Sequence, residues 1–77
     1  MRVKVFPPLG KAVKNVDDRG WMELPEGSTL ADVLKKGGIP RIMAKTLMVR
    51  LNSEPMPLNT EVKDGDVVGF FSIIAAG

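Results

Sequence analysis

The sequence predicts a single α+β domain, in which one amphipathic helix packs on one face of a mixed sheet of four or five strands. A chain of 77 residues has room for one hydrophobic core. Its hydrophobic content of 44% is typical of a globular protein rather than a disordered one. One segment has the apolar spacing of a helix, whereas several short segments have the spacing of strands. A single helix covers only one face of such a sheet, so we expect the other face to meet solvent or a partner.

The first two predicted strands form a hairpin with a long loop. Residues 2–6 alternate valine with charged side chains, which places the valines on one face of a strand. Pro7 and Pro8 end this strand, because proline cannot continue the interior of a sheet. Residues 21–24 have a similar extended pattern. On this second strand Trp21 faces away from the apolar side, so we interpret it either as an anchor for a partner or as a cover over the long loop.

The helix is predicted to begin at Thr29. Thr29 and Asp32 have the spacing of a capping box, in which the hydroxyl and the carboxylate bind free N–H groups at the helix start. Gly37 and Gly38 end the helix, as glycines commonly do. The apolar residues between these ends follow helical spacing and form an inward stripe: Leu30, Val33 and Leu34.

The second half of the chain predicts the remaining strands. Leucine and valine alternate over residues 47–51, which indicates a third strand, and residues 52–54 are a candidate tight turn. Pro55 and Pro57 restrict the next piece to an edge or irregular strand. Residues 67–71 are an apolar run that follows a polar turn, so we expect a buried central strand there.

Composition excludes several classes of function. The chain has no cysteine and no histidine, which removes thiol chemistry, the usual general base and the usual nitrogen ligand of zinc. Asp64 and Asp66 flank Gly65 in a plain turn, so we assign them neither catalysis nor a metal. Eleven basic and nine acidic residues are scattered along the chain, so we do not expect nucleic acid as a partner. The sequence shows no signal peptide and no membrane span, and we expect a cytoplasmic protein that does not bind membranes.

Three motifs in order carry a family resemblance. They are the Leu-Pro-Glu-Gly-Ser-Thr-Leu-Ala-Asp-Val-Leu entry to the helix at 24–34, the strand and turn at 49–54, and the Lys-Asp-Gly-Asp-Val-Val turn at 63–68. In this order and spacing the chain resembles the MoaD/ThiS group of ubiquitin-like sulfur carriers. The resemblance implies a β-grasp domain over residues 1–72 and a flexible C-terminal tail at 73–77. The long first loop makes the chain more similar to the small subunit of molybdopterin synthase than to the thiamine sulfur carriers.

The resemblance also implies a function for the tail. A sulfur carrier of cofactor biosynthesis is not itself an enzyme: an activating adenylyltransferase uses ATP to adenylate the carboxylate of Gly77, which becomes a thiocarboxylate that delivers sulfur inside a larger synthase subunit. The carrier itself binds no cofactor or metal. A terminal glycine suits this chemistry because it has no Cβ and lets partner backbone approach closely. Ala75 and Ala76 act as a thin spacer, although the family usually ends in two glycines.

Hydrophobic residues before the tail are candidates for docking. Phe70 and Phe71 point to opposite faces of the last strand, and we expect Phe70 to lie in the core. We predict that Phe71, Ile73 and Ile74 bind partners, since apolar residues grouped beside a reactive tail mark an interface. The alternatives are a thiamine-type carrier, a ubiquitin-like modifier whose terminal glycine is joined to lysines of other proteins, and a non-catalytic β-grasp interaction module.

Overall fold

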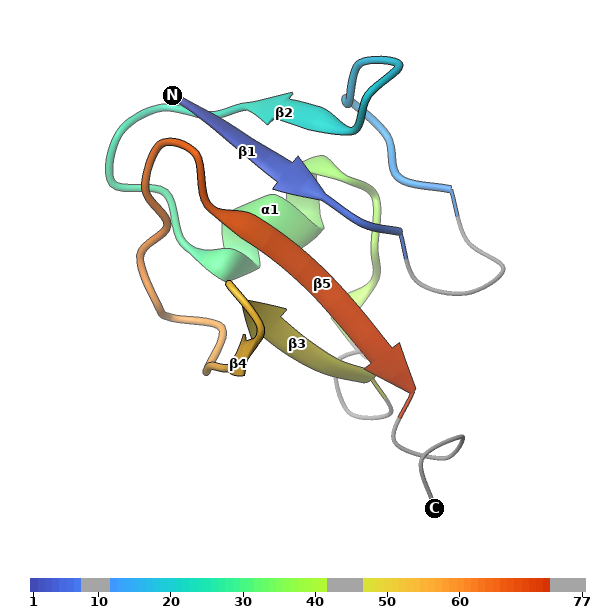
Figure 1. The fold of residues 1–77 in the computed structure, drawn as a ribbon, viewed down its shortest axis with the longest axis vertical. Helices are drawn as coiled ribbons and strands as arrows, with labels where there is room; N and C mark the ends of the chain where they lie inside the picture. Colours follow the sequence, from blue (N-terminus) through green and yellow to red (C-terminus); the bar gives the residue numbers. More distant parts are fainter. Residues whose placement is uncertain (8–11, 42–46, 73–77) are drawn as a thin grey trace.

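The computed structural model describes residues 1–7, 12–41 and 47–72, with the backbone alone at positions 47, 71 and 72. Figure 1 shows a sheet with a helix against one face. The elements in chain order are β1 (Arg2–Val5), β2 (Trp21–Glu23), α1 (Leu30–Lys36), β3 (Leu47–Leu51), β4 (Glu54–Pro55) and β5 (Val67–Ser72). The five strands form one sheet in the order β2-β1-β5-β3-β4. The predicted α+β architecture is therefore confirmed.

The last strand, β5, lies at the centre of the sheet. It runs parallel to β1, with Lys4 opposite Val67, and antiparallel to β3, with Leu47 opposite Ser72. On the far side of β1, β2 completes the predicted hairpin. β1 ends one residue earlier than predicted, although the N–H of Phe6 still donates to the carbonyl of Val68 at 2.9 Å. The prediction of a central strand after residue 66 is confirmed.

The start of α1 is fixed by the predicted capping box. The N–H of Thr29 donates to Asp32 Oδ2 at 2.9 Å, and the N–H of Asp32 donates to Thr29 Oγ1 at 3.4 Å. After the helix, Gly37 lies so close to the long loop that a Cβ there would be 2.9 Å from Val13 Cγ1. Close packing therefore favours glycine at this position, whereas its φ of −75° is one that any residue adopts.

The core lies between α1 and the sheet. Its buried members come from every layer: Val3, Val5, Met22, Leu24, Leu30, Val33, Leu34, Ile39, Val49, Val62 and Val68. Phe70 is partly buried and packs against this cluster, as predicted. The opposite face of the sheet carries the alternate residues of β1, including Arg2 and Lys4, and has no helix over it (Figure 1) within the described part of the chain.

The loop between β1 and β2 returns along the outer side of β2. Val16 forms a bridge with Met22, and the N–H of Asp17 donates to the carbonyl of Trp21 at 2.9 Å. Lys36, at the end of α1, donates from Nζ to the carbonyl of Glu23. These contacts occupy the outer hydrogen-bonding groups of β2.

Candidate functional site

The predicted reactive segment begins where β5 ends. The register of β5 with β3 continues to its last residue, so Ser72 is held opposite Leu47 and Phe71 opposite Met48. The side chain of Phe71 is not described, and its predicted role in docking stays a prediction. The same holds for the predicted residues that lie outside the described part of the chain: Ile73, Ile74, Ala75, Ala76 and Gly77.

The position of Ser72 limits the reach of the residues that follow it. Five residues follow Ser72 in the sequence, and five residues span at most about 17 Å when fully extended.

The opposite end of β5 is fixed by two turns that interlock. Asn52 accepts the N–H of Val67 on Oδ1 at 2.9 Å and donates from Nδ2 to Asp66 Oδ1 at 3.0 Å. The second oxygen of Asp66 accepts the N–H of Lys63 at 2.8 Å. Asn52 has a φ of 51°, in the left-handed region that asparagine tolerates better than most residues. These bonds fix the start of the strand whose other end leads into the tail.

The carboxylates of Asp64 and Asp66 serve this architecture. Asp64 Oδ1 accepts the N–H of Arg2 at 2.8 Å, so it ties the turn to the first strand. Both oxygens of Asp66 already accept hydrogen bonds. Within the described residues no group of three or more acidic, histidine or cysteine side chains could hold a metal ion. The two carboxylates act as structural hydrogen-bond acceptors.

On the open face of the sheet, cations and aromatic rings alternate. The guanidinium carbon of Arg2 lies 5.2 Å from the centroid of the Trp21 ring, and Lys4 Nζ lies 5.5 Å from the same ring. Lys4 Nζ is also 5.8 Å from the ring of Phe6, whose side chain is 53% exposed. The ring of Trp21 is half-buried and lies beside two cations. Its two interpretations, an anchor for a partner or a cover over the long loop, both stay predictions. Sequence reasoning missed the contribution of the cations, although their alternation along β1 was a usable signal.

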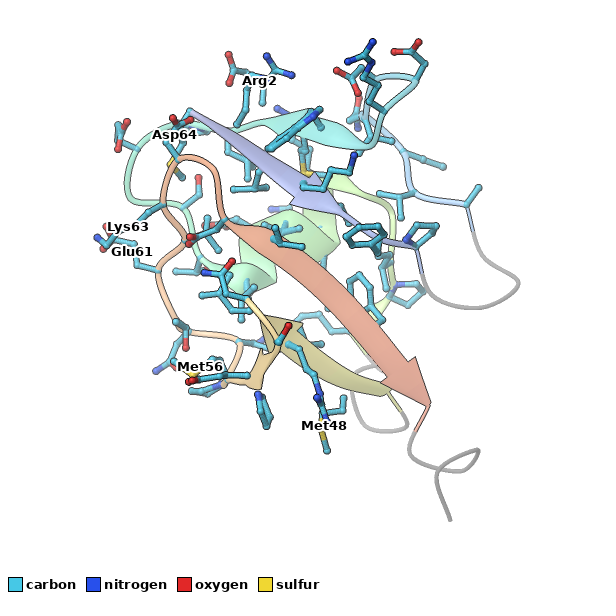
Figure 2. All side chains as sticks on the ribbon, in the orientation of Figure 1. Arg2, Met48, Met56, Glu61, Lys63 and Asp64 are labelled. Atoms are coloured by element: carbon cyan, nitrogen blue, oxygen red, sulfur yellow. The ribbon has the colours of Figure 1, made fainter. Side chains whose placement is uncertain are left out.

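Asp17 holds Arg2 over the indole. Asp17 Oδ2 lies 3.6 Å from Arg2 Nη2, while its other oxygen accepts the N–H groups of Arg19 and Trp21, each at 2.9 Å. The N–H of Trp21, together with the other donors and the charge of Arg2, lowers the pKa of Asp17 below its ordinary value. An open hollow of about 270 Å³ lies beside this pair, bordered by Arg2, Trp21, Asp64 and Gly65. Figure 2 shows Arg2 and Asp64 at one end of the molecule and Met48 toward the other.

The mixed sheet with the C-terminal strand at its centre and one helix across one face defines a β-grasp, ubiquitin-like protein. The family model described as the ThiS family matches residues 13–77, and the chain belongs to this family of ubiquitin-like sulfur-carrier proteins. Such small carriers are generally non-catalytic. The predicted β-grasp fold and membership of the MoaD/ThiS group are confirmed.

The crystal structure of SAMP1 from Haloferax volcanii has the same fold. It superposes with a TM-score of 0.62 over 99% of this chain and 97% of its own, at 19% sequence identity. No curated protein matches the sequence. None of the described helices is long and apolar enough to cross a bilayer.

Proposed function

We propose that this protein carries sulfur for cofactor biosynthesis on the C-terminal carboxylate of Gly77. One observation carries the proposal: the match to the ThiS family runs through residue 77, so it includes the tail as well as the folded domain. The central position of β5 supports it, because a strand paired on both sides gives the tail a fixed starting point. The first partner is an activating adenylyltransferase that uses ATP.

The proposed reaction has two steps. One oxygen of the Gly77 carboxylate attacks the α-phosphorus of ATP, and pyrophosphate leaves. Sulfide then attacks the carbonyl carbon, and AMP leaves with the oxygen that made the first attack, so that a thiocarboxylate remains. The partner supplies the catalytic groups, and this chain supplies the acyl group and the surface that positions it. Ala75 and Ala76 keep the tail narrow enough to enter the partner.

The thiocarboxylate then delivers sulfur inside a larger synthase subunit. We favour a partner of the molybdopterin-synthase kind, because the chain has a long loop between β1 and β2. A thiamine-type acceptor uses the same tail chemistry and differs only in the synthase. We place this exchange in the cytoplasm, where both partners are expected.

The experiment is an intact-mass measurement. The protein is incubated with the activating enzyme of the same organism, ATP and sulfide, beside a variant that lacks Gly77. The proposal predicts the mass increase that replaces one oxygen by sulfur, only when Gly77 is present. The variant Ala76→Gly is the matched control for the tail sequence, and it confirms that the activating enzyme is competent. If that variant gains the mass and the natural chain does not, the carrier proposal is wrong for this protein. Isopeptide-linked adducts would instead indicate a modifier.

A further inference from the structure

We propose that Arg2, Lys4 and Trp21, called here the cation–indole patch, bind carboxylate side chains of the activating enzyme. This inference rests on the proposed function, because it names a second contact made by the protein that adenylates Gly77. The patch lies on the open face of the sheet, on β1 and β2. It is separate from the tail and from the docking residues that the sequence predicts beside it.

Lys4 is a positive charge held in place without being neutralised. Its ammonium lies between the rings of Trp21 and Phe6, at 5.5 and 5.8 Å from their centroids. Its stem runs across Gly20, where a Cβ would lie 3.7 Å from Lys4 Cε. Among the described residues, no carboxylate pairs with this ammonium. A partly buried cation of this kind gains most when a partner brings a carboxylate, since the lysine is already ordered.

Arg2 and Trp21 are ordered in a similar way. Asp17 holds the guanidinium at 3.6 Å, and the indole packs beside it at 5.2 Å. Tryptophan and arginine are the residues that most often dominate the binding energy of protein interfaces. A half-buried tryptophan between two cations therefore has the composition of an interface centre.

The rest of the open face indicates the chemistry of the partner. Val68 and Phe70 of β5 face the core, so Val67 and Gly69 lie on the open side. By the same alternation, the described open-face positions from Lys4 toward the end of β5 carry no carboxylate: Lys4, Phe6, Met48, Arg50, Val67 and Gly69. At the other end of the patch, Glu23 of β2 lies opposite Arg2, and its Oε2 is 3.3 Å from the N-terminal amine. The surface from Lys4 toward the end of β5 is cationic and apolar. It is complementary to a partner surface that combines acidic with apolar side chains.

The patch and the tail are two separate points of attachment. Lys4 lies opposite Val67, the first residue of β5, and the strand ends five residues later at Ser72. At about 3.3 Å per residue, this separation is about 17 Å. A partner that binds the tail and the patch together must cover the length of the open face. The patch then contributes to binding without contributing to the chemistry at Gly77.

The test uses the full chain and the activating enzyme of the same organism in an ATP–pyrophosphate exchange assay. The rate is measured against carrier concentration for the natural chain, Lys4→Glu and Lys4→Gln. Lys35→Glu is the matched control, because it makes the same charge change at an exposed position of α1, on the other side of the sheet. Urea denaturation followed by circular dichroism shows that each variant is folded, because the emission of Trp21 itself depends on the charge at Lys4.

The proposal predicts that Lys4→Glu raises KM for the carrier about tenfold with kcat within about twofold of the natural value. Lys4→Gln raises KM by a smaller factor, and Lys35→Glu leaves it within about twofold. Higher salt raises KM for the natural chain more than for Lys4→Gln. If both Lys4 variants match Lys35→Glu while the natural chain is activated, the docking inference is wrong and the proposed function stands. If neither the natural chain nor Ala76→Gly is activated, the proposed function fails and the docking inference fails with it.

Discussion

The side chain of Asn52 is predicted to hold the start of β5 in place. Two substitutions separate the contribution of its hydrogen bonds from the contribution of its left-handed backbone conformation. Asn52→Gly removes the hydrogen bonds to Val67 and Asp66, at 2.9 and 3.0 Å, but accommodates the φ of 51°. Asn52→Ala removes the same bonds and places a Cβ-bearing residue with no polar group in the left-handed region.

The magnitudes follow from these contacts. A neutral hydrogen bond contributes about 1 kcal/mol and one to a carboxylate about 1.5–3 kcal/mol, and both are reduced here because the site is exposed. We expect Asn52→Gly to lower the free energy of unfolding by about 2 kcal/mol. We expect Asn52→Ala to lower it by about 1 kcal/mol more, since alanine is strained at this φ.

Urea denaturation followed by the fluorescence of Trp21 measures both values. At about 4–8 °C per kcal/mol for a domain of this size, the Gly variant should melt about 8–16 °C below the natural chain. Asn52→Asp is the control, because it keeps an acceptor for Val67 but brings a second negative charge against Asp66. A loss below about 0.5 kcal/mol for Asn52→Gly would refute the role given to these hydrogen bonds.

Three further predictions test other parts of the structure. Gly37→Ala places a methyl group 2.9 Å from Val13 Cγ1 and should destabilise the protein by about 1–3 kcal/mol. Adding Val13→Ala should recover part of that loss in a double-mutant cycle, whereas strictly additive effects would contradict the crowding. Asp17→Asn should be less stable than the natural chain at neutral pH, because folding lowers the pKa of Asp17. The difference in the free energy of unfolding should be full above the ordinary pKa of 3.8 and shrink as the pH falls below it. A pH-independent difference would argue against the bonds from Trp21. Ser53→Gly should raise the free energy of unfolding by about 0.5–1 kcal/mol, because Ser53 has a φ of 73°, and a melting temperature that falls would show that the turn needs serine.

Local signals in the sequence predicted the elements whose causes are local. Thr29, Asp32 and Gly37 lie within nine residues of one another, and they set both ends of α1 as expected. The central position of β5 was also predictable, because an apolar run of that length needs cover on both faces. The role of the tail was predicted from the family resemblance, and Gly77 remains a prediction because it lies outside the described residues.

Contacts between distant segments could not be predicted in the same way. The stacking of Lys4 on Trp21 depends on the register of β1 with β2, which brings together residues separated by a long loop. The bond from Asn52 to Asp66 joins two turns that each look complete on their own. In both cases the residue types were visible, but their neighbours in space were set by the pairing of strands.

The covered edge of β2 limits the ways in which another chain can attach to the sheet. The loop at Val16 and Asp17, with Lys36 from α1, leaves the outer groups of this strand already bonded. At the other edge β4 is two residues long and contains Pro55, which has no N–H to offer. The addition of a strand from another chain to a sheet edge is a common route to aggregation, and both edge strands of this sheet disfavour it. Under the proposed function, in which the carrier passes from one enzyme to the next, this is an advantage, because contacts made by side chains on a face separate more readily than a shared sheet.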